Sequence, residues 1–179
     1  MIYSIQDIAT IISAKGKVIM PAPIKYLAID SRKVVFSKET LFFALTTNRN
    51  DGHDFIKELV EKGVENFVVH NSFHTESFDG INFLLVENVL QALQSLAKFH
   101  RTKFLQLPNG AIFPVIGITG SNGKTIVKEW LYELLNTSYH IIRSPRSYNS
   151  QIGVPLSVWQ INEQHNLAIF EAGISTINE

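Results

Sequence analysis

Short apolar runs alternate along this chain with longer stretches in which apolar residues recur at helical spacing. Helical spacing after the N-cap-like Ser4 predicts a first helix that ends before Gly16. The other predicted helices cover residues 54–62, 89–104 and 126–135, with a turn into helix within 152–158. Runs rich in β-branched and aromatic residues predict strands at 26–29, 41–45, 66–70, 81–86, 113–118, 140–143 and 167–170. This alternation predicts an α/β layer fold.

A polar segment with Pro and Gly, residues 106–110, follows the longest predicted helix and is the best candidate for a linker. We therefore predict a small N-terminal α/β domain over residues 1–107 and a second α/β domain over residues 108–179. Sheets that bury both faces usually have about five or more strands. Because only three strand candidates follow the predicted linker, we expect the second domain to be incomplete.

Composition narrows the class of protein. With 45% hydrophobic and 18% charged residues, the chain is typical of a globular protein. Sixteen basic residues balance sixteen acidic ones, which argues against a broad surface for nucleic acid or anionic membranes. The chain has no cysteine, no secretory signal pattern at its first residues and no apolar run long enough to span a membrane. We therefore expect a cytoplasmic protein without a nucleic-acid partner or membrane span.

The most informative segment is 117–125, Gly-Ile-Thr-Gly-Ser-Asn-Gly-Lys-Thr, which lies between a predicted strand and a predicted helix. This is the context of a phosphate-binding loop, although Ile118 stands where the common pattern has its first Gly. Glycines let backbone N–H groups close around phosphate, and the helix N-terminus favours an anion. Lys124 could reach the β- and γ-phosphates and Thr125 could bind Mg²⁺. The alternative is a tight turn with a solvated lysine.

Two further segments of the second half could carry chemistry. Glu171 ends a predicted strand, and an acid at the carboxyl end of a parallel strand can hold Mg²⁺, although an exposed strand-end glutamate has the same pattern. The polar loop 143–155 contains two arginines and two amide side chains, one of them Asn149. It could bind phosphate or a carboxylate, or be an ordinary solvated loop.

In the N-terminal half, Asp30-Ser31-Arg32 follows a predicted strand and residues 51–55, Asp-Gly-His-Asp-Phe, precede a predicted helix. Ser31 and Arg32 could hold an anionic ligand. Asp and Ser also favour caps and turns, and the pattern alone favours that interpretation. His100 lies on the apolar stripe of its helix and is expected to be packed, and the six histidines show no metal-ligand spacing.

Taken together, these motifs resemble the Mur ligase family, the ATP-dependent amide ligases of bacterial peptidoglycan synthesis. The resemblance covers nearly the whole chain. It rests on Asp30-Ser31-Arg32 and on segments 41–45, 51–55, 117–125, 149–156 and 170–173, in that order. The departure at Ile118 is the form that this family uses. The resemblance implies a UDP-sugar-binding N-terminal domain followed by the beginning of a P-loop ATPase domain.

Within the family, Asn-x-x-Ile-Gly-Val-Pro-Leu and Glu-Ala-Gly look most like the member that adds D-alanyl-D-alanine to UDP-N-acetylmuramoyl tripeptide; the member that adds the third peptide residue is the close rival. The resemblance implies an acyl phosphate made from ATP and attacked by the incoming amine. The implied roles of residues are as follows: Gly120, Ser121, Asn122, Gly123, Lys124, Thr125 and Asn149 at the nucleotide, Lys124 and Glu171 in catalysis, Thr125 and Glu171 on Mg²⁺, and Ser31 and Arg32 at the nucleotide-sugar.

Some family features are missing. Thr46-Thr47-Asn48 replaces a basic residue and glycine, and the family's later histidine motif, carbamylated lysine and C-terminal domain are absent. We therefore expect these 179 residues to have no ligase turnover alone and to belong to a longer chain with further domains. In some bacteria a region of this kind is also fused to an alanine racemase, and the sequence neither shows nor excludes such a fusion. The alternatives from other classes are a non-catalytic nucleotide-binding module and a kinase-like phosphotransferase.

Overall fold

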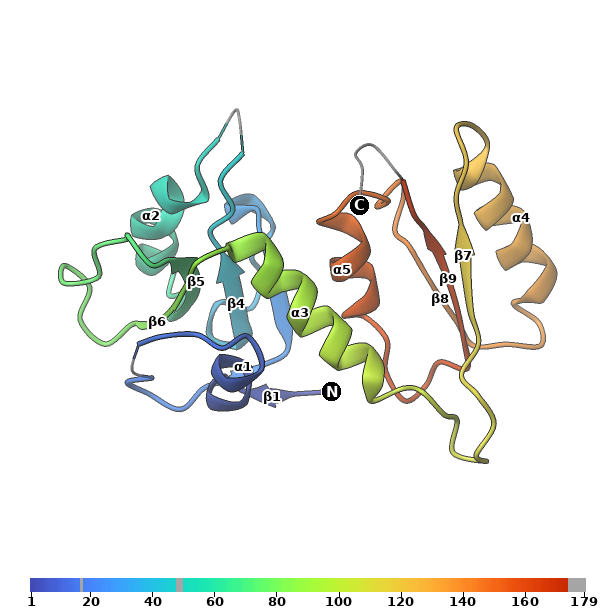
Figure 1. Cartoon of the computed structure of the whole chain (residues 1–179), viewed down its shortest axis with the longest axis horizontal. Coiled ribbons are helices and arrows are strands. Elements are labelled where there is room, and N and C mark those ends of the chain that lie inside the picture. Colours follow the sequence, from blue (N-terminus) through green and yellow to red (C-terminus); the bar gives the residue numbers. More distant parts are fainter. Residues whose placement is uncertain (17, 48–49, 174–179) are drawn as a thin grey trace. The chain divides into compact units, whose positions relative to one another are not determined.

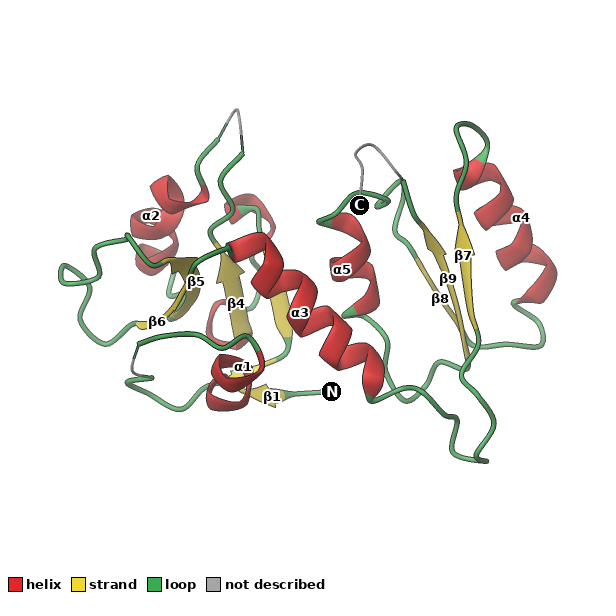
Figure 2. Cartoon of the chain, in the orientation of Figure 1, coloured by secondary structure: helices red, strands yellow, loops and turns green. Residues whose placement is uncertain are grey.

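The computed structural model describes residues 1–16, 18–47 and 50–173, and the chain forms two compact units, Met1–Leu96 and Ala97–Glu179. Helices and strands alternate along both units, which confirms the predicted α/β class (Figures 1 and 2). The division falls within helix α3, Val89–Thr102. Phe104, just before the predicted linker, and Leu107, within it, pack with Phe113 in the core of the second unit. The domain boundary after residue 107 stays a prediction.

The N-terminal unit is built on a parallel sheet in the order β3-β4-β5-β6. Its strands are β3 (Tyr26–Ala28), β4 (Thr40–Phe43), β5 (Asn66–His70) and β6 (Asn82–Val86), each close to a predicted strand. Because neighbouring strands run in the same direction, the segments that follow them emerge at one edge of the sheet. The two N-terminal motifs with candidate chemistry both follow strands of this sheet.

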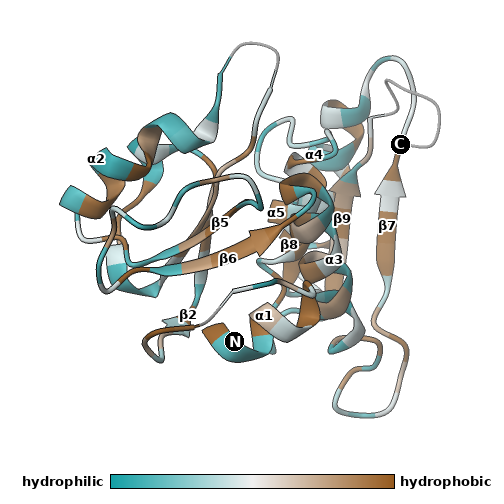
Figure 3. Ribbon diagram, turned by 60° about the vertical axis from the view of Figure 1, so that its left-hand side comes forward, coloured by the Kyte–Doolittle hydropathy of each residue, from teal (hydrophilic) through white to brown (hydrophobic). Residues whose placement is uncertain are grey.

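Both faces of this sheet are apolar. Successive side chains of a strand point to opposite faces, so a sheet covered on both sides needs apolar residues at consecutive positions. Helix α2, Ile56–Glu61, packs its buried Ile56 and Leu59 against Phe42, Phe67 and Phe83. The alternate residues Leu41, Phe43 and Val68 are also fully buried. Figure 1 shows α2 on one side of the sheet and the beginning of α3 on the other, and the strands are among the most hydrophobic parts of the ribbon in Figure 3.

Helix α1, Ile5–Ile11, begins as predicted, since the Ser4 hydroxyl accepts a 3.0 Å hydrogen bond from the backbone N–H of Asp7. Two short strands were not predicted: β1 (Tyr3–Ser4) pairs antiparallel with β2 (Pro23–Ile24). Strands of two residues are too short to show a period. The described part of the unit also contains three 3₁₀ turns, η1 (Ser31–Lys33), η2 (Ser37–Glu39) and η3 (Gly52–Phe55).

The second unit has a parallel sheet in the order β7-β9-β8, with β7 at Val115–Ile118, β8 at Ile141–Arg143 and β9 at Leu167–Glu171. Helix α4, Lys124–Leu135, covers one face, where Leu131 and Leu135 pack on Ile118 and Ile169. The core on the other face contains Val158 of helix α5, Gly153–Val158, beside Phe170. Figure 1 shows the sheet between these two helices.

The outward side of α4 is unusually apolar. Ile126, Trp130 and Leu134 are each more than half exposed, whereas Lys128 of the same helix is completely buried. A charged side chain is rarely buried without a partner. The inner side of α4 is therefore organised by polar contacts as well as by packing. Over the described residues, no helix combines the length and apolar composition needed to cross a bilayer.

Candidate functional site

The loop between β7 and α4 has the backbone geometry of an anion cradle. Gly120 and Gly123 have φ values of 135° and 78°, which favour glycine because it has no Cβ. No side chain caps the N-terminus of α4, and its first turn contains no acidic residue. Among the described residues, the N–H groups of Ser121 and Asn122 donate to no protein acceptor. These free donors lie in an exposed loop directly before the N-terminus of α4, where phosphate binding is favoured.

Lys124 and Thr125 occupy the first two positions of α4. The Lys124 ammonium donates back across the loop to the Gly120 carbonyl, so its side chain already lies over the cradle. The Thr125 hydroxyl points instead toward the sheet. It donates a 3.2 Å hydrogen bond to Oε2 of Glu171 and lies 3.4 Å from the Ser147 hydroxyl.

The position of Glu171 follows from strand register. Ile118, the last residue of β7, is the Cα partner of Glu171, the last residue of β9, so the loop begins beside this acid. Glu171 is fully buried, in contrast to the exposed strand-end alternative. Its backbone N–H donates to the Ser144 hydroxyl at 3.0 Å. The buried carboxylate and the phosphate loop are thus held at one edge of the sheet.

The polar loop 143–155 reaches the same edge. The backbone carbonyl of Asn149 accepts a 2.7 Å hydrogen bond from the N–H of Gly173, so the predicted nucleotide residue lies against the Glu-Ala-Gly segment. A Cβ on Gly153 would stand 2.8 Å from the Tyr148 carbonyl carbon, so only glycine fits where α5 begins. Of the predicted residues, Thr125 contacts Glu171 directly and Lys124 precedes Thr125 in the chain. Asn149 is hydrogen-bonded to Gly173, which follows the acid by two residues.

The Thr125 and Glu171 oxygens are chemically suited to a hard divalent cation. Mg²⁺ prefers oxygen ligands and commonly takes one or two from the protein and the rest from phosphates and water. A hydroxyl and a carboxylate oxygen 3.2 Å apart, beside a phosphate cradle, fit that pattern. Among the described residues there is no group of three or more His, Asp or Glu side chains that could hold a metal without such help.

Sequence reasoning missed Lys128, which contacts this acid directly. Its ammonium lies 2.9 Å from Oε1 of Glu171 and donates a 2.9 Å hydrogen bond to the Ser144 carbonyl. The only sequence signal was position: four residues after Lys124, it lies one helical turn further along the same side of α4.

In the N-terminal unit, Asp30, Ser31 and Arg32 form a cap and turn, as the pattern favoured. The Asp30 carboxylate caps η1 by accepting from the Arg32 N–H, and it also accepts two hydrogen bonds from the Arg32 guanidinium at 2.9 and 2.8 Å. That side-chain pairing lowers the pKa of Asp30 from 3.8 to about 2. Ser31 is buried, whereas the Arg32 side chain is 85% exposed. Arg32 is therefore oriented yet accessible to an anion.

The Asp-Gly-His-Asp-Phe motif also forms a cap, at η3. The Asp51 carboxylate accepts from the His53 N–H at 3.0 Å and lies 2.6 Å from Nδ1, while Nε2 accepts from the His70 N–H at 3.1 Å. Burial alone would raise the pKa of Asp51, but the hydrogen bonds outweigh burial and the pKa is lowered. A hollow of about 320 Å³ opens here, lined by Thr46, Asp51, His53, His70, Ser72, Phe73 and His74. Asn48, in the segment that departs from the family pattern, lies outside the described residues.

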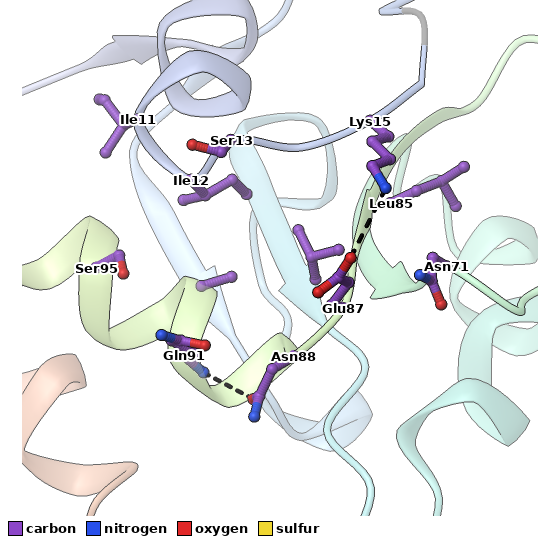
Figure 4. A pocket seen from close by; sticks show the side chains of 12 residues that line it. Ile11, Ile12, Ser13, Lys15, Asn71, Leu85, Glu87, Asn88, Gln91 and Ser95 are labelled. Carbon is purple, nitrogen blue, oxygen red and sulfur yellow. Dashed lines mark hydrogen bonds and ion pairs between the residues drawn. The ribbon is translucent and has the colours of Figure 1, made fainter.

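A second hollow, of about 390 Å³, lies between the end of α1, the end of β6 and the beginning of α3 (Figure 4). Asn88 accepts a 2.9 Å hydrogen bond from the Gln91 N–H there, and the exposed Lys15 and Glu87 form a 3.7 Å ion pair. None of the predicted site residues lines this hollow. We therefore place the candidate chemistry at the phosphate loop and not at this hollow.

Comparison with known families matches both units. Residues 23–101 match "Mur ligase family, catalytic domain", and residues 118–179 match "Mur ligase middle domain". The chain belongs to the Mur ligase family. Its relatives include two proteins named UDP-N-acetylmuramoyl-tripeptide--D-alanyl-D-alanine ligase. The one from Borreliella burgdorferi is 35% identical over 87% of this chain and 34% of the relative. The one from Bacillus subtilis is 35% identical over 86% of this chain and 31% of the relative.

Solved structures share this fold. The crystal structure I of MurF from Acinetobacter baumannii has a TM-score of 0.85 and 24% identity, over all of this chain and 37% of that one. MurF ligase from Thermotoga maritima in complex with ADP has a TM-score of 0.69 and 28% identity, over 85% of this chain and 33% of that one. The Mur ligase chain described here therefore spans about a third of the length of these relatives.

Proposed function

We propose that this chain supplies the nucleotide-sugar-binding and phosphate-binding parts of an ATP-dependent ligase that joins D-alanyl-D-alanine to UDP-N-acetylmuramoyl tripeptide through an acyl phosphate. The names of the relatives support the reaction. The structural observation that supports it best is the contact of 3.2 Å between Thr125 Oγ1 and Glu171 Oε2, beside an uncapped helix N-terminus. The reaction would take place in the cytoplasm.

Each residue of the site has a task that its geometry supports. The N–H groups of Gly120, Ser121, Asn122 and Gly123 would hold the phosphate chain of ATP. Lys124 would place its charge against the transferred phosphoryl group, because phosphoryl transfer is catalysed mainly by positioning and charge stabilisation. Thr125 and Glu171 would hold Mg²⁺, which neutralises phosphate charge when bound. Asn149 would contact the nucleotide from the opposite loop.

In the N-terminal unit, Ser31 and Arg32 would bind the anionic UDP-sugar at the carboxyl edge of the parallel sheet. Arg32 is suited to this role because its guanidinium is exposed and can form paired hydrogen bonds with phosphate. The hollow beside His53 lies after strands of the same sheet and would receive another part of this substrate.

Calorimetric titration of the chain with ATP and Mg²⁺, and separately with the UDP-linked muramoyl tripeptide, tests this proposal. Binding of both supports it, and Lys124→Ala and Arg32→Ala should weaken only the first and only the second, respectively. Binding of ATP alone would favour the non-catalytic nucleotide-binding module. Binding of the muramoyl dipeptide in preference to the tripeptide would favour the ligase that adds the third residue. Binding of neither ligand would overturn the proposal.

A further inference from the structure

Lys128 is a fully buried cation that the proposed chemistry does not use. It lies on α4 one turn after Lys124, with none of its side chain exposed. Burying an ammonium is unfavourable unless partners replace its water. The structure provides four oxygens: Oε1 of Glu171 at 2.9 Å, Oε1 of Glu129 at 3.2 Å, and the carbonyls of Ser144 and Arg146.

These partners come from three separate segments. Glu129 neighbours Lys128 on α4, Ser144 and Arg146 follow β8, and Glu171 ends β9. Arg146 has a positive φ of 52°, which residues other than glycine rarely adopt. Its backbone carbonyl accepts a hydrogen bond from the Lys128 ammonium. Lys128 therefore ties the helix of the phosphate loop both to the candidate metal acid and to the polar loop.

The contact also divides the Glu171 carboxylate between two directions. Oε1 is ion-paired with the ammonium at 2.9 Å but accepts no hydrogen bond from the described residues, whereas Oε2 accepts from the Thr125 hydroxyl. A carboxylate held at one oxygen by a buried cation cannot rotate freely about its last torsion. Its other oxygen is then fixed toward the side of the sheet where the phosphate loop begins.

We propose that Lys128 is a positioning residue of the cation site: by holding Oε1 of Glu171, it directs Oε2 and the Thr125 hydroxyl together toward a Mg²⁺–nucleotide complex. This inference rests on the proposed function, because it concerns the same site. It assigns Glu171 a single ligating oxygen. Partners that orient a metal ligand commonly change metal affinity by about 10- to 100-fold when they are removed.

The test is ADP binding by calorimetry with and without Mg²⁺, measured in the full chain. In Lys128→Met, we expect the factor by which Mg²⁺ increases the affinity for ADP to fall about 10- to 100-fold. The affinity for ADP without Mg²⁺ should stay at the wild-type level. The double variant K128M/E171Q should lose no more of the effect of Mg²⁺ on ADP binding than E171Q alone, because both substitutions disrupt the same Lys128–Glu171 pair. Glu129→Gln is the matched control, since it removes the other carboxylate of Lys128 and should keep the effect of Mg²⁺.

The outcomes separate the inference from the proposed function. If the wild-type chain binds no ADP, both the proposed function and the role of Lys128 are wrong. If wild type binds ADP and Lys128→Met keeps the full effect of Mg²⁺, only the role of Lys128 falls. Lys128→Gln, whose amide can still donate to the Ser144 carbonyl, replaces Lys128→Met should that variant not fold. If neither folds while K128M/E171Q folds and keeps the effect of Mg²⁺, Lys128 serves folding alone and the inference is wrong.

Discussion

The Thr125 hydroxyl donates to Oε2 of Glu171 across 46 positions of the sequence. Neither residue could reach the other through local structure. The contact exists because β7 and β9 are parallel neighbours whose last residues, Ile118 and Glu171, are in register. The candidate site is therefore a product of the sheet, and changes that shift the sheet edge should affect it as much as changes to its own side chains.

Lys124→Ala should weaken ATP binding about 10- to 100-fold, the equivalent of the roughly 1.5–3 kcal/mol typical of a hydrogen bond to a charged group. The fold should persist, because Lys124 begins α4 at a partly exposed position and its side chain contacts the Gly120 carbonyl. Calorimetry and thermal unfolding measure the two effects. Lys98→Ala, an exposed lysine on α3, is the control and should change neither.

Gly153→Ala should destabilise the second unit by about 1–3 kcal/mol, the usual cost of inserting a methyl group into packed structure. The new Cβ would approach backbone atoms of Tyr148 to 2.8 Å, and backbone cannot move aside cheaply. Gly117→Ala in β7 is the matched control, since a Cβ there meets nothing within 4 Å. Denaturant unfolding compares them, and equal midpoints for the two variants would contradict this prediction.

His100 should make the stability of the second unit depend on pH. Its ring is buried against Trp159 and Phe104, and its Nε2 lies 2.9 Å from the Ile161 carbonyl oxygen. Burial lowers the pKa of His100 below 6.5, although the carbonyl contact opposes the shift. The unfolded chain then binds the proton more readily than the folded one. Stability is therefore greatest above pH 6.5 and decreases as the pH falls toward the lowered pKa.

Unfolding in urea between about pH 7.5 and about pH 5 measures this effect, whose slope for one site cannot exceed about 1.4 kcal/mol per pH unit. His100→Gln should flatten the dependence, since an amide can still donate to the Ile161 carbonyl without titrating. His74→Gln is the control, because the His74 side chain is 92% exposed. A dependence that His74→Gln removes and His100→Gln keeps would refute the assignment.

The Asp30–Arg32 pair should be visible in the titration of a single carboxyl. The Asp30 pKa of about 2 depends first on its hydrogen bonds with the Arg32 side chain. In Arg32→Gln, the pKa should return toward 3.8, as measured by NMR of the Asp30 carboxyl. Since the folded pKa is the lower one, the stability that this pair contributes is present above pH 3.8 and is lost as the pH falls through about 2. An Asp30 pKa unchanged in Arg32→Gln would show that other groups set it.

Most elements of the fold could be predicted because their patterns are local. The Ser4 cap, the strand before the phosphate loop and the acid that ends β9 each depend on a few neighbouring residues, and each is confirmed as structure. The functions of Lys124, Thr125, Asn149, Glu171, Ser31 and Arg32 stay predictions.

The orientation of α4 could not be predicted in this way. Its sequence places large apolar residues at several positions around the helix, yet Trp130 and Leu134 are exposed and Lys128 is buried. The buried Lys128 contacts oxygens of Ser144, Arg146 and Glu171, which lie on other segments of the chain, and Leu131 and Leu135 pack on the sheet beside it. A single lysine shows no periodicity, so only the assembled sheet reveals its partners.

The contacts of Lys128 also limit how far α4 can slide along its own axis. One residue of helix corresponds to an axial translation of about 1.5 Å, which is enough to break hydrogen bonds of ordinary length. Purely apolar packing would tolerate small translations, whereas a buried ammonium with fixed oxygen partners does not. The contacts of Lys128 thus fix the axial position of α4. They hold its first turn, and with it the open N–H groups of the loop, in one position relative to the end of β9.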